Sequence, residues 1–370
     1  MSAKNFTKDD IRKVYRHLLG RESDDAAEEH HFNKCSSLAD LLESVFLSPE
    51  CQLRMERAKS QNEKLISEPT QKKTSKTKIM IRTFAEYDNF IREFEDSYNN
   101  KKSHAEGMSF LWAHELDFAS FMKQFGFKSI PDPFSCDYIK QELAYFEYLS
   151  GRKYSHKNEG LFLDVSQSLK LLSPYAQGYE ATTYYWKSVI NLLHVMKPLC
   201  GERVVEMGSG TGNLVELFSR LNCRVTAVEA NASCCDLIKA RCSASTFAPK
   251  IYCESFNIIE NDEDVFDYIL FESSFHHCDD PVKLLEILSG KISKKGKIIL
   301  FNEPILPSFS RPWGVVRPDG ESALQIRQKG WIEYGFREDY LSELLQRTGW
   351  SNFQKHAFPD TQPIYTAIKI

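Results

Sequence analysis

The residues from Arg203 onward constrain the fold more than any other part of the sequence. A short β-like run, residues 203–207 (RVVEM), leads into a glycine-rich turn, residues 208–212 (GSGTG). An amphipathic helix with Leu214, Phe218 and Leu221 on one face follows. A strand, a glycine turn and a helix in this order form the first half of a βαβ nucleotide-binding unit. The glycines let the backbone approach a ligand closely, and the helix N-terminus offers free N–H groups.

An acidic residue, Glu229, ends the next β-like run, residues 224–228. It lies about 20 positions after the glycine turn, where a carboxylate can accept hydrogen bonds from a ribose diol. A dinucleotide site would prefer Gly-x-Gly-x-x-Gly, but the third glycine position, 213, is Asn. A dehydrogenase built on a similar sheet is therefore the less favoured alternative.

The spacing Glu-x-Gly-x-Gly-x-Gly, which starts at Glu206, resembles the class I S-adenosylmethionine-dependent methyltransferases. Residues 266–272 (FDYILFE) are similar to the family's F-D-x-[IV] strand, and residues 273–277 (SSFHH) to its L-H-H segment. Residues 294–300 (KKGKIIL) are similar to its L-K-P-G-G turn and fifth strand, without the proline and the second glycine. The resemblance implies an α/β, Rossmann-like methyltransferase fold over residues 161–370.

The same resemblance implies a seven-stranded, mostly parallel sheet that binds S-adenosyl-L-methionine. Residues 250–253 are expected to form the third strand, and residues 351–358 and 363–370 an antiparallel C-terminal hairpin. An element that begins near Tyr179 is expected to cover the cofactor pocket. The implied cofactor-binding residues are Glu206, Gly208, Ser209, Gly210, Thr211, Gly212, Glu229, Ala230, Asn231, Glu254, Glu272, Tyr179 and Tyr184.

Two adjacent histidines, His276 and His277, come just after the fourth strand, at the sheet edge where open α/β folds bind ligands. An alcohol acceptor must lose a proton during methylation, and histidine has a pKa suited to that task. One of the pair is therefore predicted to act as the general base, with His276 slightly preferred. The alternative is that the histidines pack within the loop. Glu303, at a neighbouring strand end, is the third catalytic candidate.

A metal-assisted reaction would use Asp279, Asp280 and Asn302, because hard cations take oxygen ligands. Asp279-Asp280-Pro281 is also an ordinary helix start, with carboxylates near the positive end of the helix. No metal site is therefore predicted.

Residues 304–338 form a connection much longer than the roughly 2 to 6 residues typical of such folds, and we expect a lid there. Aromatic and arginine side chains suit sugar stacking and anionic groups. The expected substrate contacts are Arg311, Trp313, Arg317 and Tyr334, whereas Trp331 is expected to pack on the sheet.

Three segments precede this domain. Residues 1–58 are predicted to form a helical module. Within it, residues 15–24 (YRHLLGRESD) and 46–50 (FLSPE) resemble a small bacterial domain of unknown function that is often fused to glycosyltransferases. The alternative is an arbitrary three-helix module that mediates oligomerisation. Residues 59–78 are predicted to be a solvated linker that tethers the module, and residues 79–160 an aromatic-rich, all-helical layer.

Composition narrows the partners. The 47 Lys and Arg residues against 51 Asp and Glu residues give a formal net charge of -4, which provides no electrostatic basis for binding nucleic acid. No apolar run approaches the roughly 20 residues of a membrane-spanning helix, and the polar N-terminus is unlike a secretory signal. The ten cysteines form no CxxC pair, so reduced thiols and a cytoplasmic location are expected.

The flanking segments 302–305, 313–314, 319–321 and 330–337 resemble a bacterial methyltransferase branch associated with surface-polysaccharide clusters. The predicted function is O-methylation of a sugar or glycan intermediate in cell-surface polysaccharide biosynthesis. A methyltransferase for another small molecule or natural product, and a non-catalytic cofactor-binding scaffold, are the alternatives. A peripheral membrane or glycan-assembly partner is expected at the N-terminal module.

Overall fold

The computed structural model describes most of the chain, with gaps near the N-terminus, in the helical segment and at the start of the C-terminal domain. The described residues are 7–15, 21–36, 38–46, 48–50, 78–99, 104–130, 132–160, 163–171 and 179–370. The predicted linker, residues 59–78, lies outside them except for Lys78, and so do residues 51–58 of the predicted helical module.

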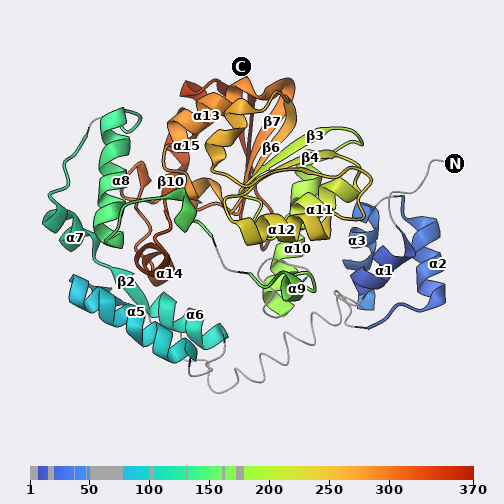
Figure 1. Cartoon of the computed structure of the whole chain (residues 1–370), viewed down its shortest axis with the longest axis horizontal. Helices are drawn as coiled ribbons and strands as arrows, with labels where there is room; N and C mark the ends of the chain where they lie inside the picture. The colour runs from blue at the N-terminus through green and yellow to red at the C-terminus, as the bar shows by residue number, and fades with distance from the viewer. Residues whose placement is uncertain are drawn as a thin grey trace.

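A seven-stranded sheet forms the centre of the molecule, in the order β11-β12-β7-β6-β3-β4-β5 (Figure 1). Strands β3 to β7 run parallel, while β12 is antiparallel to both β7 and β11. The predicted mostly parallel sheet with an antiparallel C-terminal hairpin is thereby confirmed. The strands are β3 (Arg203–Met207), β4 (Arg224–Val228), β5 (Lys250–Tyr252), β6 (Phe266–Glu272), β7 (Ile292–Phe301), β11 (Trp350–His356) and β12 (Ile364–Lys369).

Helices cover both faces of this sheet, because alternate residues of the buried strands point to opposite sides. Val204 packs in one core cluster and Val205 in the other. The first cluster contains α10 (Tyr179–Met196), α11 (Asn213–Arg220) and α12 (Ala232–Arg241). The second contains α13 (Pro281–Gly290) and α15 (Glu338–Arg347). This three-layer arrangement leaves the carboxyl ends of the parallel strands at one edge, where ligands bind in such folds.

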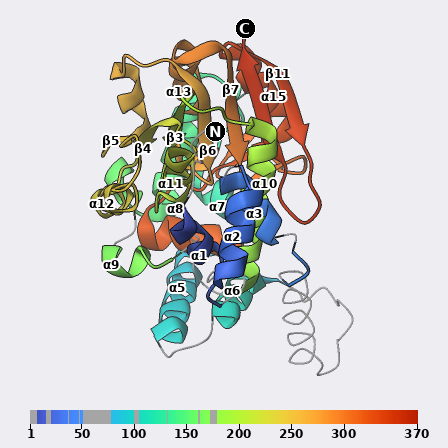
Figure 2. The same ribbon diagram turned by 90° about the vertical axis from the view of Figure 1, so that its right-hand side faces the viewer.

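The N-terminal helices pack against the catalytic domain instead of standing apart from it (Figure 2). They are α1 (Lys8–Val14), α2 (Asp25–Lys34) and α3 (Leu38–Phe46). Ile11 and Leu41 are fully buried in the same cluster as Val189 of α10. Asp10 forms a 2.9 Å ion pair with Arg220 of α11. The expectation of a merely tethered module is therefore wrong for these helices: their apolar faces are part of the domain's core.

The segment before the catalytic domain is helical, as expected, apart from one pair of strands. Strands β1 (Ile79–Ile81) and β2 (His114–Leu116) pair in parallel, and the all-helical expectation for residues 79–160 is wrong at this point. Three-residue strands carry too little sequence pattern to be recognised. The helices are α5 (Phe84–Asn99), α6 (His104–Ala113), α7 (Phe118–Phe125) and α8 (Cys136–Ser150), followed by two shorter turns, η2 (His156–Asn158) and α9 (Val165–Ser168).

The long connection between β7 and α15 is folded onto this helical layer. Buried Glu142 of α8 accepts hydrogen bonds from the Arg311 guanidinium and from the Val315 N–H group, the latter at 3.0 Å. The connection contains a small sheet in the order β8-β10-β9. Its elements are β8 (Ile305–Leu306), β9 (Trp313–Gly314), α14 (Gly320–Leu324), η5 (Gln325–Lys329) and β10 (Gly335–Arg337). Most of the expected lid is thus a packed part of the core.

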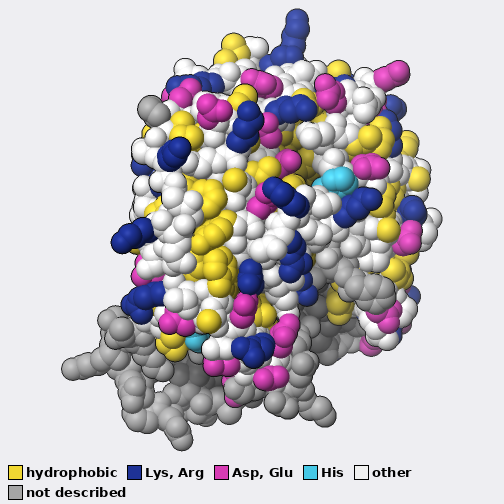
Figure 3. Space-filling view, turned by 60° about the vertical axis from the view of Figure 1, so that its left-hand side comes forward, with side chains coloured by type: hydrophobic (Ala, Val, Ile, Leu, Met, Phe, Trp, Pro, Cys, Tyr) yellow, Lys and Arg dark blue, Asp and Glu magenta, His cyan; other side chains and the backbone are white. Residues whose placement is uncertain are grey.

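The side of the molecule that carries the helical layer has a mixed surface (Figure 3). Basic and acidic side chains are interspersed over this face, together with a band of hydrophobic ones. Within the part of the chain that the structure describes, no helix is both long and apolar enough to cross a bilayer.

Candidate active site

The glycine turn after β3 approaches the turn after β6 very closely. The N–H groups of Gly208 and Ser209 both donate to the Val228 carbonyl oxygen, at 2.8 and 3.1 Å. Gly208 has a φ of +75°, and a Cβ atom there would lie 2.5 Å from Cβ of Ser274. Only glycine satisfies both conditions, since other residues rarely adopt this φ and have no room for the side chain.

A cavity of about 310 Å³ opens beside this turn, at the carboxyl ends of β3, β4 and β6. The residues expected to bind the cofactor that line it are Glu206, Gly208, Ser209, Gly210, Thr211, Glu229, Ala230 and Glu272. Tyr185, Phe256, His277 and Trp331 are among the other lining residues. The structure therefore brings most of the predicted cofactor residues to one cavity.

Two buried acids shape this cavity. The Glu229 carboxylate accepts hydrogen bonds from the N–H groups of Gly210 at 2.7 Å and Asn231 at 2.8 Å, and burial raises its pKa. Glu206 is also buried, and its Oε2 atom has no hydrogen-bond partner among the described residues. Burial, together with Glu272 and Glu229, holds the pKa of Glu206 well above its ordinary value. An ammonium group placed in the cavity would give this oxygen the partner it lacks.

Some predicted cofactor residues lie outside this cavity. Asn231 caps α12 by accepting from the N–H groups of Ser233 and Cys234, at 2.9 and 3.2 Å. Gly212 begins α11 with a φ of +75° and does not line the cavity. Glu254 lines a smaller, adjoining cavity of about 140 Å³. These three residues therefore do not line the cavity, although Gly212 and Asn231 hold the start of the helices beside it.

The helix that covers the cavity presents a different tyrosine from the expected one. Tyr184 is 37% exposed, and its hydroxyl oxygen accepts from the Gln362 N–H group at 3.1 Å. Its neighbour Tyr185 is buried and lines the cavity. The prediction for Tyr184 is therefore wrong by one position on α10. The side chain of Tyr179 lies outside the described residues.

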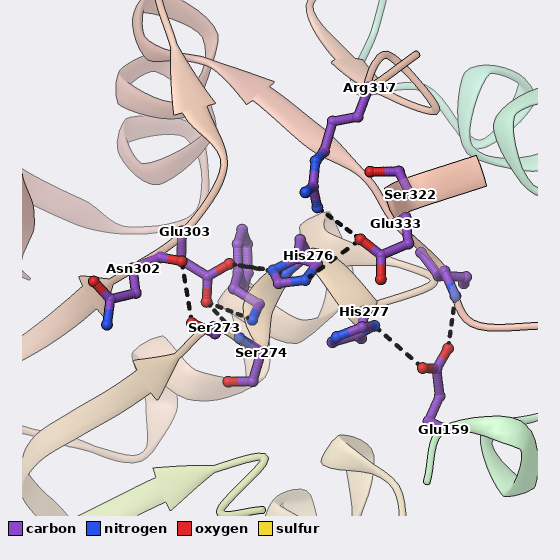
Figure 4. A network of polar contacts seen from close by, with 12 residues as sticks. Glu159, Ser273, Ser274, His276, His277, Asn302, Glu303, Arg317, Ser322 and Glu333 are labelled. Atoms are coloured by element: carbon purple, nitrogen blue, oxygen red, sulfur yellow. Dashed lines mark hydrogen bonds and ion pairs between the residues drawn. The ribbon is translucent and has the colours of Figure 1, made fainter. Parts of the chain in front are cut away.

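His276 is engaged by Glu303 and does not line the cavity (Figure 4). Its Nδ1 atom lies 2.7 Å from Oε2 of Glu303, and burial lowers the pKa of His276 to about 4. The other oxygen of Glu303 accepts from the N–H groups of Ser274 and Phe275, at 2.7 and 2.8 Å. Glu303 and His276 therefore hold the shape of the turn, and neither the preference for His276 as base nor a direct role for Glu303 fits this geometry.

His277, in contrast, lines both cavities. Its Nδ1 atom lies 3.2 Å from Oε2 of Glu159, a residue that precedes the predicted catalytic domain. Burial alone would lower the pKa of His277, but Glu159, with further contributions from Glu333 and Glu303, outweighs it and raises the pKa to about 9. Of the two histidines, His277 is the one placed to meet a ligand.

Glu333 and Arg317 extend this polar network beyond His276 (Figure 4). The Arg317 guanidinium lies 2.6 Å from Oε2 of Glu333, and the same oxygen is 3.9 Å from Nε2 of His276. His276, His277 and Glu333 each offer a ligand atom within 4.8 Å of the others, a spacing that a metal ion can use. Because Arg317 already neutralises Glu333, a network of protons and ion pairs fits these residues better.

The four residues predicted to contact substrate do not line the cavity. Arg311 pairs with Glu142, and Arg317 with Glu333. Trp313 is buried, and its indole N–H group donates to the Pro133 carbonyl oxygen at 2.9 Å. The same burial applies to Tyr334, whose ring packs on Trp313 at 5.6 Å between centroids. Arg311 and Trp313 join the long connection to the helical layer, whereas Arg317 and Tyr334 contact residues within the connection itself. The substrate prediction is therefore wrong in position.

Several lining residues were not predicted as site residues, among them Glu159, Gly160 and Trp331. Trp331 was expected to pack on the sheet, but its ring meets His277 edge-to-face, with centroids 5.8 Å apart and an interplanar angle of 89°. The sequence signal that could have identified Trp331 was its position directly after Gly330, which caps the helix Gln325–Lys329. For Glu159, a lone acid in a polar loop, the sequence contains no comparable signal.

The alternative metal ligands have structural partners. Asp280 caps α13 by accepting from the Lys283 N–H group at 3.0 Å, and Asp279 accepts from the Asp280 N–H group at 3.0 Å. The Asn302 side chain donates to Glu272 at 3.1 Å. The first two carboxylates thus form the helix start that their sequence also suggested.

Comparison with known proteins agrees with this fold. A family model described as "Methyltransferase domain" matches residues 176–355. Together with the seven-stranded sheet and its glycine turn, this match defines a class I, S-adenosylmethionine-dependent methyltransferase domain. The chain carries this domain in its C-terminal part, preceded by segments that the family model does not cover.

The chain has low sequence identity to individual curated proteins and solved structures. The ubiquinone biosynthesis O-methyltransferase of Coxiella burnetii is 26% identical over 100 residues, which are 27% of this chain and 43% of that protein. The chain thus matches less than half the length of these curated relatives. Among solved structures, a methyltransferase from Mesorhizobium loti has 16% identity and a TM-score of 0.41, covering 49% of this chain and 98% of that one. Magnesium protoporphyrin IX methyltransferase from Synechocystis PCC 6803, with bound SAM, has 13% identity and a TM-score of 0.36, covering 62% and 97%.

Proposed function

We propose that this protein transfers the methyl group of S-adenosylmethionine to a hydroxyl group of an uncharged acceptor, with His277 as the general base. The observation that carries the proposal is the position of His277 in the same cavity as the glycine turn, Glu206 and Glu229. The cofactor supplies an activated methyl group on a sulfonium sulfur. The chain must then bind it, align the acceptor and take up one proton.

The cavity residues divide these tasks. Glu229 stands where a ribose diol would be bound, and the unpartnered oxygen of Glu206 fits an ammonium group. The N–H group of Gly210 already donates to Glu229 and thereby fixes the acid at the cavity wall. His277, on the neighbouring turn, accepts the hydroxyl proton of the acceptor. Trp331 gives the wall beside it an aromatic surface, which suits the apolar face of a sugar or another ring.

The charge of the lining favours an acceptor without phosphate or carboxylate at the reacting end. Four lining residues are acids: Glu159, Glu206, Glu229 and Glu272. The described lining includes neither Lys nor Arg, and His277 already faces Glu159. An anionic group would lack a cationic partner there and would meet like charges.

A sugar or glycan intermediate of cell-surface polysaccharide biosynthesis is the acceptor class we propose. The aromatic surface of Trp331 and the absence of a cationic partner for an anionic acceptor support a sugar ring. The resemblance of the flanking segments to a branch associated with surface-polysaccharide clusters supports a role in polysaccharide biosynthesis. A different hydroxyl-bearing small molecule is the second candidate, favoured by the similarity to the ubiquinone O-methyltransferase. A non-catalytic scaffold would keep the cavity but would release no S-adenosylhomocysteine.

The experiment is to measure release of S-adenosylhomocysteine by the full chain with a panel of neutral glycosides and phenols, each paired with its phosphorylated or carboxylated analogue. We expect turnover with members of the neutral set only. Turnover confined to the anionic analogues would overturn the acceptor class, and no release with any hydroxyl acceptor would favour the scaffold.

The base is tested with paired variants. His277→Gln should reduce turnover by about 10²-fold or more while S-adenosylmethionine affinity changes by less than about threefold. Undiminished turnover in the folded His277→Gln variant would remove His277 as the base. His276→Asn is the comparison: its effect should come through stability, because His276 does not line the cavity.

A further inference from the structure

We infer that Glu159 is a positioning residue for methyl transfer: its carboxylate fixes the ring of His277, so that the segment before the methyltransferase domain completes the active site. The inference rests on the proposed function. It adds a residue that lies outside the part of the chain matched by the family model, residues 176–355.

The backbone around Glu159 is held in place from two sides. Oε1 of Glu159 accepts from the Ile332 N–H group at 2.8 Å, which ties it to the long connection. The next residue, Gly160, packs so tightly on the Asn231 side chain that a Cβ atom there would collide with it. The carboxylate is thus fixed between the connection and the turn after β4, with its second oxygen, Oε2, directed at His277.

His277 depends on this contact for its orientation. Its Nδ1 atom is buried and makes no regular hydrogen bond within the described residues, so the 3.2 Å approach of Glu159 Oε2 is its close polar contact (Figure 4). Trp331 limits the ring from the other side, and the Trp331 indole N–H group donates to the Asn158 carbonyl oxygen, next to Glu159. Glu159 and Trp331 therefore fix the ring together.

This contact decides which nitrogen of His277 is available. A proton on Nδ1 is stabilised by the Glu159 carboxylate, which leaves Nε2 as the nitrogen with a free lone pair when the ring is neutral. In the transfer step, Nε2 takes the hydroxyl proton, and the acceptor oxygen forms a bond to the methyl carbon. The carbon–sulfur bond breaks, and its electron pair stays on sulfur as a neutral thioether. The proton then leaves His277 for solvent.

The carboxylate also sets the proton affinity of the base. His277 faces Glu159 from the preceding segment, Glu333 from the connection and Glu303 from the end of β7. Its neighbour His276 carries little charge near neutral pH. Glu159 is the closest acid and contributes most to the raised pKa of His277. Removing this charge should therefore lower the pKa of the base as well as loosen its ring.

The test is an NMR titration of the full chain labelled in its histidine rings, without cofactor or acceptor. The His277 signal is assigned by its loss in His277→Gln. We expect a pKa of about 9 in the native chain. In Glu159→Gln it should fall by roughly one unit or more. Glu159→Asp should recover part of this shift. The amide oxygen of Gln can still accept from Ile332, so the variant should fold.

Glu147→Gln is the matched control, because Glu147 lies on the same layer and pairs with Lys153 away from the cavity. It should leave the His277 titration unchanged. A His277 pKa that is the same in Glu159→Gln and in the native chain would overturn the inference.

Measurements of turnover and of S-adenosylmethionine binding distinguish a positioning role of Glu159 from a merely structural one. With an acceptor from the neutral panel, Glu159→Gln should lower the limiting kcat, measured at a pH above the pKa of His277, by about tenfold or more. S-adenosylmethionine affinity should stay within about threefold, and the pH of half-maximal rate should move downward. A normal limiting kcat would contradict a positioning role. If the panel gives no turnover in the native chain, the proposed function fails on its own, while the titration still decides whether Glu159 controls His277.

Discussion

Glu303 holds the turn that carries both histidines: its carboxylate lies 2.7 Å from Nδ1 of His276 and accepts from three backbone N–H groups of the same turn. The side chain of Glu303 is fully buried. A carboxylate that accepts several hydrogen bonds from one turn fixes the backbone there. The orientation of His277 toward the cavity therefore depends on Glu303, although Glu303 does not reach the cavity itself.

Replacement of Glu303 should destabilise the fold. Glu303→Gln would place an NH₂ group against N–H donors and leave the His276 ring without its carboxylate, and we expect a loss of about 2 to 4 kcal/mol in the free energy of unfolding. Urea denaturation measures it. The control, Glu343→Gln, removes an exposed pair with Arg347 and should cost less than about 0.5 kcal/mol. Equal stability of the two variants would show that the turn does not need Glu303.

The glycine turn gives a prediction about binding. Gly208→Ala puts a methyl group against Ser274, so the turn after β3 must shift, and S-adenosylmethionine affinity should fall by about tenfold or more. Gly126→Ala is a matched control, because Gly126 also has a positive φ, +73°, but nothing lies within 4 Å of its Cβ position. Both changes strain the backbone, by about 1 kcal/mol. Calorimetry should detect weakened binding in Gly208→Ala alone; native affinity in that variant would contradict the close approach.

The two histidines predict opposite pH dependences of stability. His277 has a folded-state pKa of about 9, above its ordinary value, so its contribution is complete below pH 6.5 and is lost as the pH rises through 9. The pKa of His276, about 4, lies below its ordinary value, so its contribution is complete above pH 6.5 and is lost as the pH falls through 4. Stability from this pair should be greatest near pH 6.5.

The His277 contribution can be isolated by difference. A pKa raised from 6.5 to about 9 corresponds to roughly 3 kcal/mol. The native chain should lose this amount relative to His277→Gln between pH 6.5 and a pH above 9, as measured by urea denaturation at each pH. The groups facing the ring are Glu159, Glu333, Glu303 and, across the cavity, Glu229. A difference that stays constant with pH would mean that these acids do not hold a proton on His277.

Because the N-terminal helices pack into the core of the catalytic domain, the two should unfold together. Ile11 is fully buried in the cluster that includes α10 and α11, so Ile11→Ala should lower the melting temperature of the whole chain in a single transition, at a cost of about 2 to 4 kcal/mol. Leu199→Ala, at a site 67% exposed, should have little effect. An unchanged main transition in Ile11→Ala would instead indicate a module that unfolds independently of the catalytic domain.

The sequence was sufficient to predict the strands of the sheet, but not to predict most of the residues proposed to contact the acceptor. Strands β3, β4 and β6 have the predicted bounds, because buried parallel strands are continuous apolar runs with clear ends. Arg311 and Trp313 were misplaced because composition does not distinguish an aromatic or arginine that meets substrate from one that meets the core. The partner of Arg311, Glu142, lies 169 positions away in the chain. Glu159 is likewise brought to His277 only by the folded backbone.

The central claim is that the cavity at the glycine turn binds S-adenosylmethionine. Its most direct test is calorimetric titration of the full chain with S-adenosylmethionine, with the Glu229→Ala variant alongside. We expect one binding site per chain and an affinity at least about tenfold weaker in Glu229→Ala, because the acid at the end of β4 faces the cavity. A folded native chain that shows neither heat of binding nor a rise in melting temperature at saturating S-adenosylmethionine would contradict it.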